Sequence, residues 1–90
     1  MPTLKIPTPL RYYTNGNAEV PVQGQTVQEA MGSLVQQYPS LQPHLYSPEG
    51  KLRAFVNLFV GEDNIKDLQG LETPLGPEAK LRLIPSIAGG

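Results

Sequence analysis

Residues 26–38, TVQEAMGSLVQQY, decide the fold because they predict one well-delimited amphipathic helix. Thr26 is a suitable N-cap, and Glu29 three residues later completes a capping box. Pro39 ends the helix, since a proline cannot continue the helical hydrogen bonding. A single amphipathic helix cannot bury its apolar side alone, so it needs a sheet to pack on. The apolar stripe at helical spacing consists of Val27, Ala30, Met31, Leu34, Val35 and Tyr38.

Two short segments before this helix show apolar residues at alternate positions, which predicts strands. The first spans residues 4–10, and its two prolines make its end irregular or place it at a sheet edge. The second spans residues 18–22. Between them, Asn15-Gly16 is a strong hairpin signal because both residues tolerate positive φ. We therefore expect two short strands ahead of the helix, joined by a tight turn.

Two longer alternating segments follow the helix and predict the main strands, residues 53–60 and residues 79–84. Residues 39–50 predict the loop that leads into the first of them. A turn follows that strand, and Ile65 begins a short return strand or extended piece. Residues 68–75 are expected to cover one end of the core. In the first main strand the aliphatic face is Ala54, Val56, Leu58 and Val60, and the other face is Arg53, Phe55, Asn57 and Phe59.

This order of elements predicts an α+β fold of the β-grasp (ubiquitin-like) type, in which a mixed sheet is crossed by one main helix. A ferredoxin-like fold would need a second helix of similar length. The only candidate for it, residues 63–70, is too short and has no apolar stripe. We expect residues 1–85 to form the β-grasp domain and residues 86–90 to form a flexible C-terminal tail with two glycines.

Composition removes most kinds of catalytic site. The 90 residues contain no cysteine, which excludes disulfides, thiolate catalysis and cysteine-based metal centres. The single histidine, His44, is expected to be an ordinary loop residue, and no nucleotide-binding glycine motif is present. We therefore expect no metal, no bound cofactor and no enzymatic activity of the chain's own side chains.

Charge and hydropathy exclude two classes of partner. The formal net charge is −1, so a basic patch that dominates nucleic-acid binding is not expected. The most apolar stretch, residues 54–60, is far shorter than the roughly 20 residues of a membrane-spanning helix. The opening residues 1–10 lack a basic leader followed by an apolar run, so we expect a cytoplasmic protein.

The last predicted strand runs directly into the tail, residues 83–90, LIPSIAGG. Glycine has no Cβ, so Gly89 and Gly90 make the chain as narrow as a polypeptide can be. Such a tail can thread a channel, with Ile87, Ala88 and Gly89 inside, and present its terminal carboxyl to a partner's active site. Five extended residues reach roughly 17 Å. The alternative is an ordinary frayed end.

The tail after a final strand resembles the ubiquitin-like sulfur carriers of the MoaD and ThiS type. The resemblance covers essentially the whole chain. Three internal blocks are most similar to the CysO-like branch, which is associated with cysteine synthesis. These blocks are FVNLFV at residues 55–60, EDNI at residues 62–65 and GLETPL at residues 70–75.

The resemblance implies that Gly90 is the residue that carries sulfur. In this family an E1-like enzyme of the MoeB/ThiF type uses ATP to adenylate the terminal glycine, and a sulfur donor then leaves a thiocarboxylate. The carrier is a co-substrate rather than a catalyst. The implied acceptors are a cysteine synthase or a molybdopterin synthase large subunit, and in the cysteine branch a metalloprotease releases a C-terminal adduct.

Several alternatives stay open at this point. The same tail chemistry serves the small subunit of molybdopterin synthase, thiamine synthesis and tRNA thiolation. A ubiquitin-like modifier would use Gly90 to form isopeptide bonds to lysines, whereas a plain interaction domain would carry the two glycines incidentally. In every case the outward face of the sheet is the expected docking surface, unless residues 68–75 cover its aromatic side chains. The docking candidates are Arg53, Phe55, Phe59 and Arg82.

Overall fold

The computed structural model describes residues 1–54 and 56–85. Within these residues no helix is long and apolar enough to cross a membrane. The strands are β1 (Thr3–Lys5), β2 (Glu19–Pro21), β3 (Val56–Val60), β4 (Asp63–Asn64) and β5 (Lys80–Pro85). The α-helices are α1 (Val27–Gln37) and α2 (Gln42–Leu45), and the 3-10 helices are η1 (Thr8–Thr14), η2 (Pro39–Leu41), η3 (Ile65–Asp67) and η4 (Gly70–Glu72).

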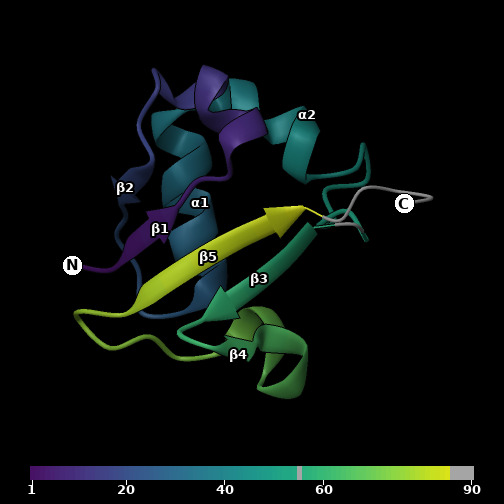
Figure 1. Ribbon diagram of the computed structural model, residues 1–90. Coiled ribbons are helices and arrows are strands. Elements are labelled where there is room, and N and C mark those ends of the chain that lie inside the picture. Colours follow the sequence, from purple (N-terminus) through teal and green to yellow (C-terminus); the bar gives the residue numbers. More distant parts are fainter. Residues whose placement is uncertain (55, 86–90) are drawn as a thin grey trace.

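The five strands form one mixed sheet in the order β2-β1-β5-β3-β4. β5 is the central strand, and it pairs in parallel with β1. The other three pairs of neighbouring strands are antiparallel. Figure 1 shows α1 crossing one face of this sheet. The predicted α+β architecture, a mixed sheet with one main helix in the β-grasp order, is therefore confirmed.

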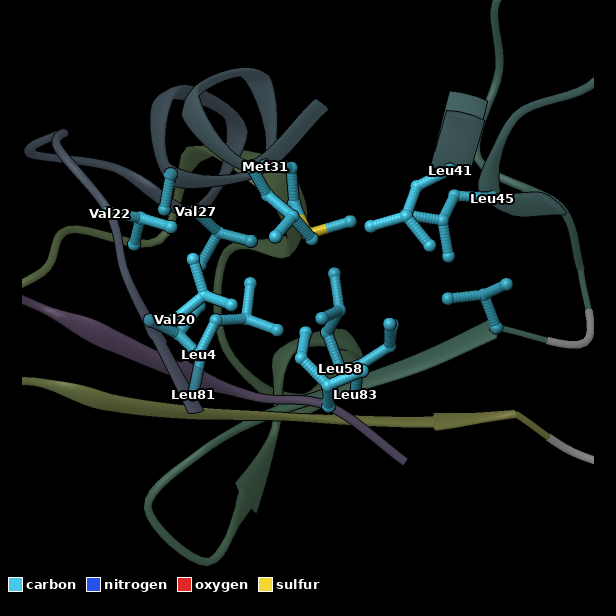
Figure 2. Close-up of a cluster of buried hydrophobic side chains, with 14 of the residues drawn as sticks. Leu4, Val20, Val22, Val27, Met31, Leu41, Leu45, Leu58, Leu81 and Leu83 are labelled. Carbon is cyan, nitrogen blue, oxygen red and sulfur yellow. The ribbon is translucent and has the colours of Figure 1, made fainter. Parts of the chain in front are cut away.

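The core lies between α1 and the sheet, and Figure 2 shows its side chains pointing toward one another from both layers. The buried positions of α1 are the predicted stripe from Val27 to Leu34, with Val35 and Tyr38 partly buried at its end. The strands contribute aliphatic side chains at every second position, as the period of a strand requires. The largest fully buried side chains of the strands are Leu4, Val20, Leu58 and Leu81.

The start of α1 is held much as the sequence predicts. The Thr26 hydroxyl accepts a hydrogen bond from the backbone N–H of Glu29 at 3.2 Å. The Glu29 carboxylate accepts one from Gln25, one residue before the N-cap, at 2.7 Å. The backbone N–H of Val27 donates to the carbonyl of Thr73 at 3.0 Å, which ties the first turn of the helix to the segment after η4.

Replacing Gly32 with alanine is expected to stabilise the protein by about 1 kcal/mol. A glycine inside a helix suggests close packing, but Gly32 is exposed and a Cβ built on it would meet no atom within 4 Å. Alanine therefore gains helix propensity without a clash. Chemical denaturation of Gly32→Ala beside the wild type measures the change. A lower midpoint would show that the glycine is needed for packing.

The structure corrects the prediction for the segment after β1. Residues 8–10, expected to be the irregular end of the first strand, belong to the 3-10 helix η1, which continues to Thr14. Asn15 and Gly16 have positive φ values of 56° and 82°, but they end η1 rather than forming a two-residue hairpin. Proline at the start of η1 supplies the helical φ and lacks only an N–H that a first turn leaves unpaired.

The predicted loop at residues 39–50 is wrong in its first half, which forms η2 and α2. Leu41 and Leu45 are fully buried there and close one end of the core. Ala54, expected on the aliphatic face of the strand, is exposed and precedes β3. Ile65 does not begin a return strand: β4 ends just before it, and Ile65 starts η3 with its side chain buried.

Candidate functional site

The face of the sheet that lies away from α1 is not covered by any helix of the described chain (Figure 1). We call it the open face. On β5, Leu81 and Leu83 are buried while Lys80, Arg82 and Ile84 are exposed, so the strand alternates as predicted. The side chains assigned to the open face by this alternation are Thr3, Lys5, Glu19, Pro21, Asn57, Phe59, Lys80, Arg82 and Ile84.

Phe59 and Arg82, two of the predicted docking residues, lie together on this face. They are directly opposite each other across β3 and β5. The guanidinium carbon of Arg82 lies 5.2 Å from the centre of the Phe59 ring, and its Nη2 donates to the carbonyl of Gly61 at 3.2 Å. Such a cation–π contact contributes about 0.5–1 kcal/mol at an exposed site. The pair therefore forms one preorganised aromatic and cationic unit.

Phe59 is half-buried, between the two interpretations that the sequence left open. In residues 68–75, Leu71 and Leu75 pack against the core, as expected, but Leu68 is exposed. The guanidinium of the exposed Arg82 lies over the Phe59 ring. A partner that docks on the open face would meet both side chains at once.

Arg53, the third docking candidate, lies elsewhere. It precedes β3, and its Nε donates to the carbonyl of Pro43 in α2 at 3.0 Å. Its backbone N–H donates to the carbonyl of Leu45 at 2.9 Å. Arg53 is thus held at the start of β3, at the other end of the strand from Phe59. Phe55, the fourth candidate, lies outside the described residues.

The open face adjoins the base of the predicted tail. The last described residue of β5, Pro85, pairs with Val56 at the start of β3, and Ile84 pairs with Asn57. Ile84 is 42% exposed, a large apolar side chain on the surface next to the tail. The tail candidates Ile87, Ala88, Gly89 and Gly90 lie outside the described residues.

Two cations of the same region were not predicted as site residues. Lys5 is the parallel partner of Arg82 in the sheet, and Arg11 of η1 lines the same groove as Lys5, Arg82 and Ile84. The alternation of Lys5 with Leu4 and Ile6 signals its outward direction. Nothing in the sequence pattern signals that β1 lies beside β5, because strand adjacency is not encoded in periodicity.

One aromatic contact joins η1 to α2. The rings of Tyr13 and His44 stack with 4.3 Å between their centres and 33° between their planes. His44, expected to be a loop residue, belongs to α2 instead, and it is exposed. Burial raises the pKa of the Tyr46 hydroxyl above its ordinary range, so this phenol stays protonated near neutral pH.

A family model and a curated protein each match nearly the whole chain. The ThiS family model matches residues 4–90 of the chain. The sulfur carrier protein CysO of Mycobacterium tuberculosis (strain ATCC 25618 / H37Rv) is 32% identical over 90 residues, covering 98% of this chain and 97% of CysO. The match therefore spans nearly the full length of both proteins.

Solved structures agree with this result. A chain of the crystal structure of the Amycolatopsis orientalis BexX/CysO complex has a TM-score of 0.89 and 31% identity, with both chains covered completely. The solution structure of the small archaeal modifier protein 1 (SAMP1) from Methanosarcina acetivorans has a TM-score of 0.86 and 27% identity, covering 99% of this chain and 95% of SAMP1. Both matches include the whole sheet and α1.

Proposed function

The chain belongs to the ThiS family, and we propose on this basis that it is a sulfur carrier protein that serves cysteine biosynthesis. The observation that carries the proposal is the near full-length match to the sulfur carrier protein CysO. The family model extends to Gly90, so the match includes the two glycines of the tail. The protein acts as a co-substrate of other enzymes.

The chemistry that we propose takes place at the carboxyl group of Gly90. A free C-terminal carboxylate has a reference pKa of about 3.3–3.7, so near neutral pH it is an anion and a poor electrophile. An activating enzyme of the MoeB/ThiF type lets this carboxylate attack the α-phosphorus of ATP, and pyrophosphate leaves. Hydrosulfide then attacks the carbonyl carbon of the acyl adenylate, AMP leaves, and loss of a proton gives the thiocarboxylate.

The domain supports this chemistry by carrying the tail rather than by catalysis. No cofactor is bound by the carrier in this proposal, since ATP belongs to the activating enzyme. The thiocarboxylate is the nucleophile that delivers sulfur to an acceptor held by a second enzyme of the cysteine synthase type. A metalloprotease then releases the product from Gly90. All of these steps take place in the cytoplasm.

Docking of the activating enzyme uses the open face next to the tail. Phe59 and Arg82 form its centre, because aromatic and arginine side chains dominate binding at protein interfaces. Arg53, which precedes β3 at the end where Val56 pairs with Pro85, and Phe55, whose role is proposed from the sequence alone, are the secondary docking residues. The five tail residues span roughly 17 Å when extended, enough to reach an active site while the domain stays outside it.

Truncation of the docking pair is expected to weaken activation. Phe59→Ala and Arg82→Ala should each raise the KM of the carrier about tenfold, since interface residues of this kind each contribute more than about 1 kcal/mol. The measurement is ATP–pyrophosphate exchange by the activating enzyme. Gln36→Ala, on the exposed side of α1, is the control. Folded variants that are activated as readily as the wild type would refute the docking role.

A second function, modification of other proteins, is favoured by the likeness to SAMP1, which is named as a modifier protein. The two functions share an activated Gly90 and differ in the acceptor. The sequence allows them to be distinguished, because no lysine or arginine follows Arg82. Trypsin would therefore leave residues 83–90 attached to a modified lysine.

The experiment recovers the protein and the total proteins from its own cells. A thiocarboxylate at Gly90, without lysines that bear residues 83–90, supports the carrier function. Lysines of other proteins that carry this remnant, with no thiocarboxylate on the free protein, would replace the carrier by the modifier. In a matched experiment in vitro, sulfide is added to the purified protein, its activating enzyme and ATP.

A further inference from the structure

A groove runs along the open face between β5 and the start of η1. It has a volume of about 250 Å³, and its lining includes Lys5, Arg11, Arg82 and Ile84. A second hollow of about 270 Å³ lies along β1 and β5 and shares Lys5 and Arg82 with the first. Lys80 lines this second part. We call the two together the basic groove.

The basic groove concentrates positive charge on a chain whose net charge is −1. Lys5, Arg11, Lys80 and Arg82 line it, and Glu19 is the single acidic residue among the described lining residues. Glu19 lies across the strand pair from Lys5 and offsets part of this charge. The groove therefore carries an excess of cations on a protein that is slightly acidic as a whole.

These cations are available to a partner. In the part of the chain that the structure describes, the ammonium groups of Lys5 and Lys80 have no hydrogen bond or ion pair. The Nε of Arg11 donates to the carbonyl of Ile6 at 3.0 Å, which holds the guanidinium on the wall of the groove. Its two Nη groups have no partner among the described residues. An arginine held in this way is suited to a bidentate contact with a carboxylate.

We propose that the basic groove binds an acidic segment of the activating enzyme, with carboxylates on Lys5, Arg11 and Lys80 and an apolar side chain against Ile84. The inference rests on the proposed function and names the partner's chemistry at the docking face. Activation is the step shared by every acceptor pathway, so the activating enzyme is the occupant. The groove lies beside the base of the tail, where that enzyme must contact the domain.

The nucleotide itself is not the occupant. β1 and β5 are parallel, so η1 follows β1 at the same end of the sheet from which the tail follows β5. When the tail extends into the activating centre, the Gly90 carboxyl and its ATP lie up to roughly 17 Å beyond Pro85. The groove stays with the domain, and its cations meet the outer surface of the enzyme.

The test removes two charges from the groove and the same two charges elsewhere. The groove variant is Lys5→Gln with Lys80→Gln, and the matched control is Lys51→Gln with Lys66→Gln. All four lysines are exposed, so neither change should affect folding, which thermal melting checks. The net charge of the two double variants is identical. Activation is followed as ATP–pyrophosphate exchange by the activating enzyme, at low and at high salt.

The groove variant is expected to show a KM for the carrier about tenfold higher at low salt, because charge steering raises association rates by about 10–10³. Its kcat should be unchanged, the difference should shrink at high salt, and the control should behave as the wild type. If the wild type is activated but both double variants have equal KM values, the inference is overturned and the proposed function is not. No activation of the wild type would overturn the proposed function as well.

A titration of the free protein with inorganic phosphate covers the competing ligand. If phosphate binds near Lys5 and Arg11 and the groove variant loses this binding without any change in KM, the groove is an anion site unrelated to docking. That result would also overturn the inference. The expected result is that phosphate does not saturate the groove and that KM alone separates the two variants.

Discussion

Deletion of Gly90 is expected to lower the rate of activation at least about 100-fold, because a misplacement of 1 Å at a reacting centre can cost that much. The deletion moves the terminal carboxyl back by roughly 3.3–3.6 Å along an extended chain. Docking on the open face does not involve the tail glycines, so binding of the domain should persist. ATP–pyrophosphate exchange measures activation, and a direct binding titration measures docking.

Two further tail variants separate reach from shape. Deletion of Ser86 shortens the tail by the same length but keeps both glycines, so it should also reduce activation strongly. Gly90→Ala keeps the length and adds one methyl group, which tests how narrow the partner's channel is. If the Gly90 deletion is activated at the wild-type rate, the terminal glycine does not carry the reaction, and the two glycines are incidental to an interaction domain.

Leu81→Ala is expected to destabilise the protein by about 2–5 kcal/mol, the usual cost of removing a buried leucine. Leu81 is 1% exposed and lies on β5, the strand between β1 and β3. Its loss leaves a cavity between the sheet and α1, which the neighbouring strands fill only in part. Native domains have a total stability of only about 5–15 kcal/mol, so this loss is a large fraction of the total.

The control for this prediction is Ile84→Ala, on the same strand but on the open face. Because Ile84 is 42% exposed, its truncation should cost less than about 1 kcal/mol. Urea denaturation of both variants gives the two changes in the free energy of unfolding. Equal changes would mean that Leu81 and Ile84 are equally buried, which would contradict the alternation described for β5.

The sequence predicted those elements in which apolar residues recur at a clear helical or strand spacing. The stripe from Val27 to Leu34 and the alternation of Leu81 with Arg82 both follow from burial on one side, so the sequence carries them directly. η1 and α2 were missed because they are too short to show a period and because each contains a proline, which is usually a sign of a loop or an irregular end. Those prolines lie at helix starts, where a missing N–H costs nothing.

The site divides in the same way. The outward direction of Phe59 and Arg82 could be predicted from alternation, and the structure brings the two side chains together. The basic groove could not be predicted, because it depends on the parallel pairing of Lys5 with Arg82 and on the position of Arg11 in η1. Both depend on contacts between segments far apart in the sequence. Arg53 faces outward in the predicted pattern, but a hydrogen bond from its Nε to the carbonyl of Pro43 holds it against α2.

The most direct test of the central claim is the intact mass of the protein after activation. The wild type is incubated with an activating enzyme of the MoeB/ThiF type from the same organism, ATP and sulfide. We expect the intact protein to gain the mass difference between sulfur and oxygen, and only when ATP is present. An unchanged mass, under conditions in which the same enzyme converts another carrier, would contradict the claim that Gly90 carries sulfur.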